Sequence, residues 1–241
     1  MNTAVASRPP GEVEISAHGK MYHFLSMCFA HPDGDMLEWW QGGTALEEIL
    51  AVAGRLPKPE DLVEKLMSRV KELVEDANQL SFEELEATYI RMFACGVPQV
   101  LCPPYSSLFT SADDDKRLGE MIAVRDFYED CGMVVSADFK DLPDHICVEF
   151  EFLQYLAYEA ERARVGGEEK LGAFFEDKAR GFIDRHAMGL LDGMEAVTAM
   201  IRPHNFYCGL IGFAAAVLRH DRACRHAATS GTASVQKGLD Q

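Results

Sequence analysis

One short stretch of the chain combines residue types that could bind a cation. Leu142-Pro143-Asp144-His145 is followed by Glu149. Proline suits the first turn of a helix and an acidic group there favours the helix dipole, so Pro143-Asp144 predicts a helix start. His145 and Glu149 would then be neighbours at i, i+4. An exposed acid–imidazole–acid cluster could grip a group such as arginine, although the pattern alone fits a cap with an ion pair better.

A second stretch precedes it in the chain. Pro103 and Pro104 fix an extended backbone that lacks two N–H donors, and Tyr105 follows with a flat apolar ring and a polar tip. Residues 96–111 hold three prolines, which predicts an irregular segment rather than a helix. Its many apolar side chains predict that it packs onto the body of the protein. Physics alone favours a rigid connector here.

Metal chemistry has weak support in the sequence. The nearest cluster is His220, Cys224 and His226, at the edge of the expected tail. Zinc usually takes four ligands, often in tight pairs, so we expect no metal site. A frayed helix end is the simpler interpretation.

Nucleophilic chemistry is equally unspecific. Cys95, Cys102 and Cys147 could each be paired with several histidines, but no spacing singles out one pair. Buried cysteine is more often a small apolar filler than a nucleophile. We therefore expect no catalytic residue.

The elements that must position these residues are helices. Apolar side chains recur at helical spacing along most of the chain and strand signals are nearly absent, which disfavours a nucleotide-binding α/β fold. Ser81 and Glu84 form a capping-box pattern that predicts another helix start. The expected helices cover residues 12–30, 44–53, 61–77, 81–96, 113–130 and 143–164, with two or three more over 168–220.

Composition and charge limit the function classes. The 241 residues are 48% apolar and 26% charged, which excludes a largely disordered protein. The net charge of −16 disfavours nucleic acid and anionic membranes as partners. Basic peptides, small molecules and neutral protein surfaces remain compatible.

Compartment and domain organisation follow from further patterns. Seven cysteines without a C-x-x-C pair indicate a reducing compartment. No secretory leader and no run of about 18 apolar residues is seen, so we expect a cytoplasmic protein without stable membrane insertion. The fold class is all-α, a single globular domain of about ten helices at 12–222. We expect a flexible N-terminus at 1–11 and a disordered tail at 223–241.

The order of several motifs resembles a known family. The segment 86–93 reads EATYIRMF, residues 103–109 read PPYSSLF, and residues 142–146 read LPDHI. The TorD/DmsD/NarJ family of redox-enzyme maturation chaperones has "Y-x-x-L-F", then "P-P-Y-E-S-x-Y", then "P-D-H-[IL]" at the start of a long helix. The resemblance covers roughly residues 18–220. The family's glutamate after P-P-Y is Ser106 here, its later tyrosine is Phe109, and the "L-F" leucine is Met92.

The resemblance implies an all-helical, TorD-like cytoplasmic chaperone rather than an enzyme. Such proteins bind the catalytic subunit of a molybdopterin oxidoreductase, often by its twin-arginine leader, and assist cofactor insertion and assembly before export. An arginine-rich apolar leader needs a groove of apolar groups beside acidic ones. On this resemblance we expect that client-binding residues are Tyr89, Phe93, Pro103, Pro104, Tyr105, Pro143, Asp144, His145 and Glu149.

Alternatives stay open at this point. The client could be a cytoplasm-facing subunit of nitrate-reductase type. The chain could also be a helical enzyme with a buried pocket, or a plain adaptor. A monomer and a homodimer both fit. No residue argues for a bound nucleotide, pterin or other cofactor.

Overall fold

The structure is a computed structural model that describes residues 13–57, 60–96, 99–110, 113–136 and 139–239. These residues form eleven α-helices, two π-helical segments and no β-strand, which confirms the all-α prediction. Along the chain the elements are α1 (Ala17–Phe29), α2 (Gly34–Gln41), α3 (Thr44–Ala53), α4 (Glu60–Asn78), α5 (Phe82–Tyr89), η1 (Ile90–Ala94), α6 (Ser107–Thr110), α7 (Asp114–Asp130), α8 (Ile146–Val165), α9 (Glu169–Phe182), η2 (Ile183–Ala187), α10 (Met188–Thr198) and α11 (Phe206–Leu239).

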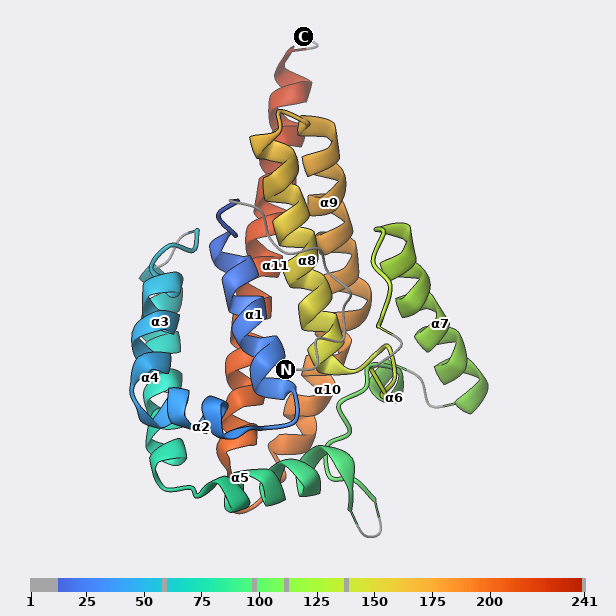
Figure 1. Cartoon of the computed structure of the whole chain (residues 1–241). Coiled ribbons are helices and arrows are strands. Elements are labelled where there is room, and N and C mark those ends of the chain that lie inside the picture. The colour runs from blue at the N-terminus through green and yellow to red at the C-terminus, as the bar shows by residue number, and fades with distance from the viewer. Residues whose placement is uncertain (1–12, 58–59, 97–98, 111–112, 137–138, 240–241) are drawn as a thin grey trace.

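The α8 helix lies at the centre of the bundle. Figure 1 shows it between α1 and α9, with α11 behind them. Its apolar side chains, among them Phe150 and Phe152, are buried with those of α1, α9 and α11 in one hydrophobic core. Burial of apolar surface on this scale is the main stabilising contribution in a helical domain. The α8 helix is therefore held in place chiefly by its packing against α1 and α9.

Small residues let the neighbours of α8 approach it closely. A Cβ atom added to Gly19 of α1 would lie 3.0 Å from Cβ of Ala157. A Cβ added to Gly172 of α9 would lie 3.4 Å from the carbonyl oxygen of Ala160. Larger side chains at these positions would push the helices apart, because packed cores leave few voids to absorb them.

A buried carboxylate joins the first helix to the last. Asp221 of α11 is 1% exposed and accepts a hydrogen bond from the Tyr22 hydroxyl of α1. Arg225 donates to the same carboxylate from Nε at 2.8 Å, and Nδ1 of His18 lies 3.4 Å from its other oxygen. Burial by itself raises the pKa of Asp221, but His18, Arg225 and Tyr22 outweigh it and the net shift is downward. Each oxygen of this buried acid therefore has a partner.

Most helices begin and end near the expected residues. The Ser81–Glu84 capping box is present, with both reciprocal hydrogen bonds formed. The α8 helix differs, because its N-cap is His145 rather than Pro143 or Asp144. The His145 imidazole accepts the N–H of Cys147 at 3.2 Å, which leaves the Asp144 side chain free to act elsewhere.

Two helices were missing from the sequence prediction. The α2 helix follows the Pro32 stop at once, because the Asp33 carboxylate caps it by accepting the N–H of Met36. The prediction that residues 96–111 contain no helix is wrong for α6. This single turn begins three residues after the last proline, where the backbone N–H groups are available again.

The expected flexible N-terminus at 1–11 lies outside the described residues. The segment expected to be a disordered tail continues α11 as a helical backbone to Leu239. Ala223, Ala227 and Ala228 favour a helix, and Arg225 ties its first turns to Glu176 of α9. Among the described residues no helix is both long and apolar enough to span a membrane.

Candidate functional site

The two stretches singled out in the sequence meet in the structure. Tyr105 and His145 form an isolated antiparallel β-bridge. The N–H of Ile146 donates to the carbonyl of Pro104 at 2.9 Å, and the N–H of Ser106 donates to the carbonyl of Asp144 at 3.1 Å. The proline stretch is thus hydrogen-bonded along the residues that open α8. We call residues 103–110 the cover segment.

Asp144 holds the cover segment through its side chain as well. Its Oδ2 accepts the N–H of Ser107 at 3.0 Å, so it caps the short α6 helix across 37 residues of sequence. Asp144 is completely buried. Its Oδ1 has no hydrogen-bond partner among the described residues. One oxygen of Asp144 therefore helps to hold the cover segment, and the other forms no hydrogen bond within the described residues.

Glu149 is the most unusual group of the site. It lies one turn into α8, is 1% exposed, and no described residue forms a hydrogen bond to either of its carboxyl oxygens. Burial raises its pKa to about 8. The neighbouring Ser106 hydroxyl favours the ionised form and opposes part of this shift. At neutral pH the buried carboxyl is therefore mostly protonated.

The expectation of an exposed acid–imidazole–acid cluster is wrong. Asp144, His145 and Glu149 are all buried, at 0%, 4% and 1% exposure. The His145 ring faces the Cys147 thiol at 2.9 Å from Nδ1 instead of pairing with Glu149. Burial lowers the pKa of His145 to about 4, so this imidazole is neutral at pH 7. The cover segment accounts for part of this burial, because it is hydrogen-bonded along residues 144–146, and Tyr128 of α7 packs on the same region through its hydrogen bond to the carbonyl of Pro143.

The proline and tyrosine residues form the edge of the site. Pro103, Tyr105 and Pro143 are half-buried, whereas Pro104 is buried. The Tyr105 hydroxyl donates to Oδ1 of Asp141 at 2.7 Å, and its ring lies 5.4 Å from that of His145. Three neighbouring apolar side chains are at least one-third exposed, namely Leu101, Leu108 and Leu142. This edge exposes apolar, aromatic and proline surface beside the buried acids, with the exposed Asp141 carboxylate at the Tyr105 hydroxyl.

Tyr89 and Phe93 belong to an adjoining aromatic cluster. They are 7% and 3% exposed, and their rings lie 5.2 Å apart. Both rings contact Tyr207 of α11, at 5.6 and 5.1 Å. The half-buried Tyr105 has a raised pKa through burial, the Asp141 hydrogen bond and, to a smaller extent, neighbouring Tyr89. Tyr89 and Phe93 thus lie near the edge of the site but beneath its surface.

Sequence reasoning missed the residues that hold the cover segment on its other side. The Phe109 side chain lies against Gly193 of α10, where an added Cβ would be 2.3 Å from the ring. Thr110 lies against Gly189, with its methyl 3.2 Å from such a Cβ. The signal was present in the sequence, because Gly189 and Gly193 at i, i+4 must share one helix face.

No metal centre is formed by the described part of the chain. No group of three or more His, Cys, Asp or Glu residues there could hold an ion. His220 and Cys224 lie together at 3.7 Å, but His220 faces the carbonyl of Pro57 and His226 pairs with Asp184. Cys102 and Cys147 are buried, and burial raises the pKa of the Cys102 thiol to about 12. Neither has the low pKa of a nucleophile.

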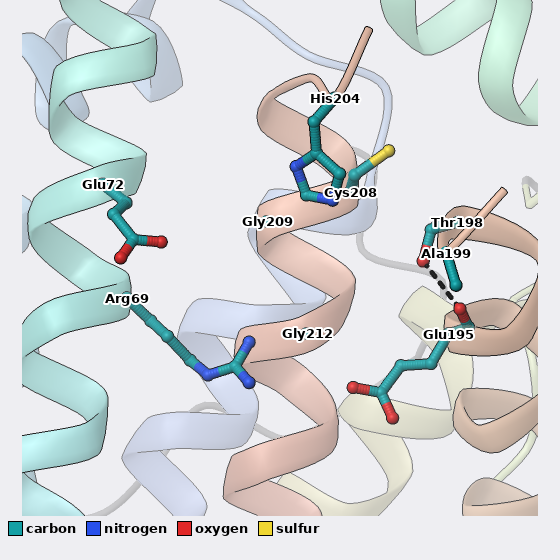
Figure 2. A pocket seen from close by; sticks show the side chains of 9 residues that line it. All are labelled: Arg69, Glu72, Glu195, Thr198, Ala199, His204, Cys208, Gly209 and Gly212. Carbon is teal, nitrogen blue, oxygen red and sulfur yellow. Dashed lines mark hydrogen bonds between the residues drawn. The ribbon is translucent and has the colours of Figure 1, made fainter. Parts of the chain in front are cut away.

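A separate pocket lies between α4, α10 and α11. Figure 2 shows the Arg69 side chain reaching from α4 across Gly212 of α11, with Glu72 and Glu195 on either side. The volume is about 190 Å³, and His204, Cys208 and Thr198 contribute to the lining. None of the nine predicted client-binding residues lines it.

Comparison with known proteins places the chain in a family. The family described as "Nitrate reductase delta subunit" matches residues 59–188, more than half of the chain. The perchlorate reductase assembly chaperone protein of Dechloromonas aromatica is 23% identical over 82% of this chain and 85% of its own length. The selenate reductase assembly chaperone protein of Thauera selenatis is 33% identical over 44% of this chain and 53% of its own length.

Among solved structures, a putative redox enzyme maturation protein from Archaeoglobus fulgidus is 20% identical to the chain. It matches 75% of this chain and 98% of its own length, with a TM-score of 0.37. The family match spans α4 to the start of α10 and so contains both stretches of the site. The resemblance to the redox-enzyme maturation chaperones is thereby confirmed, and the chain belongs to the nitrate reductase delta subunit family.

Proposed function

We propose that this protein is a cytoplasmic chaperone that binds the catalytic subunit of a molybdopterin oxidoreductase. It holds the subunit, by its twin-arginine leader, while the cofactor is inserted and the enzyme is assembled for export. It acts by binding and not by catalysis. The observation that carries the proposal is the meeting of the two family stretches at one apolar edge above the buried acids Asp144 and Glu149.

The chemistry of a basic, partly apolar leader fits this edge. The chain carries a net charge of −16, which attracts basic segments at long range. Tyr105, Leu101, Leu108 and Leu142 offer apolar surface that a leader's apolar stretch can cover. The relatives named above are called assembly chaperones of reductases, which supports the same class of client.

The test is recovery of the client from the native host grown anaerobically, with the tagged chain as bait and mass spectrometry as readout. We expect a molybdopterin catalytic subunit that still carries its leader. The Tyr105→Ala variant should recover at least several-fold less of it, because the ring forms the edge of the site. Met200→Ala is the matched control, since Met200 is 79% exposed in the turn after α10 and belongs to neither stretch.

Three other results would change the proposal. Recovery of a reductase subunit without a leader would favour a cytoplasm-facing client. Equal recovery by wild type and Tyr105→Ala would contradict the site. Recovery of no redox enzyme by any bait would contradict the proposed function itself.

A further inference from the structure

The two acids of the proposed client site are closed off from solvent. A client cation can pair with Asp144 or Glu149 only if it reaches them, and both are 0–1% exposed. The cover segment lies against Asp144 through the hydrogen bonds of Ser106 and Ser107. The Ser106 hydroxyl is also a neighbour of Glu149, and Tyr128 of α7 lies near the same carboxyl group. Burying carboxyl groups whose oxygens lack partners is unfavourable. In the closed arrangement the two acids therefore form a polar site in which most of the carboxyl oxygens have no hydrogen-bond partner among the described residues.

The cover segment is held down by a small seat. On the α10 side, Phe109 packs against Gly193 and Thr110 against Gly189, both within the single turn of α6. The seat depends on the missing side chain at Gly193: an added Cβ would lie 2.3, 2.5 and 2.8 Å from three carbon atoms of Phe109. At such distances the Phe109 residue has to move as a whole. One methyl group at position 193 can thus disturb the cover without touching Asp144 or Glu149.

We propose that the cover segment is a latch, seated by Phe109 on Gly193, that closes the Asp144–Glu149 site in the free protein and lifts when a basic client side chain enters. This inference rests on the proposed function, because it names how access to that same site is controlled. In the closed state the acids are shielded from stray cations. In the lifted state a guanidinium gains two carboxylates and the client's apolar stretch can cover the edge around Tyr105.

Lifting the latch exchanges contacts within the protein for contacts with water and the client. Lifting the latch gives up the Ser106, Ser107 and Ile146 hydrogen bonds and the Phe109 seat. It returns Glu149 to water, where its pKa falls towards the ordinary value and the carboxylate becomes charged. A neutral ligand gains nothing from that charge, whereas a cation does. The latch therefore makes binding selective for basic clients.

Two variants weaken the latch in different ways. Gly193→Ala displaces Phe109, and Phe109→Ala removes the side chain that fills the seat. Gly119→Ala is the matched control, because Gly119 lies in α7 and nothing lies within 4 Å of its would-be Cβ. The probes are two synthetic peptides, acetyl-Arg-Arg-Phe-Leu-Leu-amide and the same peptide with both arginines replaced by citrulline, a neutral isostere. Calorimetry gives the affinity of each peptide for each full-length variant.

Hydrogen exchange reports the latch itself. The backbone N–H groups of Ser106, Ser107 and Ile146 are its hydrogen-bond donors, so peptides from mass spectrometry that contain them read its opening. We expect Gly193→Ala and Phe109→Ala to raise exchange there at least several-fold, with Gly119→Ala unchanged. The arginine peptide should bind these two variants at least threefold more tightly than wild type, and it should raise exchange at the same sites in wild type. The citrulline peptide should do neither.

The two proposals fail in distinguishable ways. If the arginine peptide binds wild type and Gly193→Ala equally while the three N–H groups stay protected, the latch is wrong and the client site stands. If the arginine and citrulline peptides bind alike, or neither binds any variant, the proposed client site is wrong and the latch falls with it.

Discussion

Two buried acids of this protein have opposite surroundings and opposite pKa shifts. Asp221 lies between α1 and α11 with Tyr22, His18 and Arg225 around it, and its pKa is lowered despite burial. Glu149 lies at the start of α8 with no hydrogen-bond partner among the described residues, and burial raises its pKa to about 8. The first acid is ionised and structural. The second is kept neutral and unsatisfied.

The contrast separates a structural site from a candidate functional one. A fold that needs a buried carboxylate for stability provides partners for it, as at Asp221. A fold that leaves one without partners loses stability there, and such groups gather at binding and catalytic sites. Glu149 and the free Oδ1 of Asp144 belong to this second kind. Their position beside the two family stretches is why we propose them, and not Asp221, as the acids that bind the client.

The largest effect is expected when the charge of the hydrogen-bonded acid, Asp221, is removed. Asp221→Asn leaves the buried Arg225 guanidinium without its main counter-charge, so we expect a loss of about 3–5 kcal/mol in the free energy of unfolding. Urea denaturation at pH 7 measures it. Asp184→Asn is the control, since Asp184 also pairs with an arginine but at a more exposed position, where about 1 kcal/mol or less is expected. Equal losses in the two variants would contradict the structural role of Asp221.

The second prediction concerns pH and the unsatisfied acid. Folded Glu149 keeps its proton up to a pKa of about 8, whereas the unfolded chain releases it near the model-peptide value of 4.5. Wild type should therefore lose about 1.4 kcal/mol per pH unit, relative to Glu149→Gln, as pH rises towards 8. The pKa values of His145 and His186 are lowered to about 4, so these two groups make the folded protein more stable as pH rises. Their effect on stability is confined to pH values below about 6.5.

Urea denaturation between pH 6.5 and 8 therefore isolates the Glu149 contribution. The difference in stability between Glu149→Gln and wild type should grow across that range in favour of the variant. Gln cannot ionise, so its own curve should lack this slope. A constant difference over the range would show that Glu149 is ionised in the folded protein and that the contrast with Asp221 is wrong.

The smallest effect on stability is expected when each of two buried tyrosine hydroxyls is removed in turn. The Tyr22 hydroxyl donates to the Asp221 carboxylate, whereas the Tyr207 hydroxyl has no partner among the described residues. Tyr22→Phe should lose about 1–3 kcal/mol, because it removes a hydrogen bond to a charged group. Tyr207→Phe should be neutral or slightly stabilising, since no hydrogen bond is lost. Thermal unfolding of both variants measures the pair, and similar losses would contradict it.

Local patterns in the sequence predicted most of the helices. Apolar spacing and the Ser81–Glu84 capping box located α4, and the helical run formed by α5 and η1, to within a residue or two. They did not show that the last turn of that run is π-helical. The start of α8 was missed by a few residues, because Pro143 and Asp144 are good first-turn residues and nothing local shows that Asp144 is engaged elsewhere. The Asp33 cap of α2 was overlooked, although its type and position are standard.

The site could be predicted only in part, because its decisive contacts are distant in sequence. The family stretches indicated that Tyr105 and His145 matter, and the structure brings them together. Their burial could not be read from spacing, since it depends on Ser107 reaching Asp144 across 37 residues. The Tyr22–Asp221 pair, 199 residues apart, was equally invisible. Whether the nine residues bind a client remains a prediction.

Calorimetric titration of the client's leader peptide tests the central claim most directly. The peptide is the leader of the reductase subunit recovered with the tagged chain, and the proteins are wild type, Asp144→Asn and Met200→Ala. Asparagine keeps an oxygen that can accept the Ser107 N–H but removes the charge. We expect Asp144→Asn to bind at least tenfold more weakly than wild type, which is about 1.4 kcal/mol, with Met200→Ala unchanged. Equal affinity for wild type and Asp144→Asn would contradict the assignment of these buried acids to client binding.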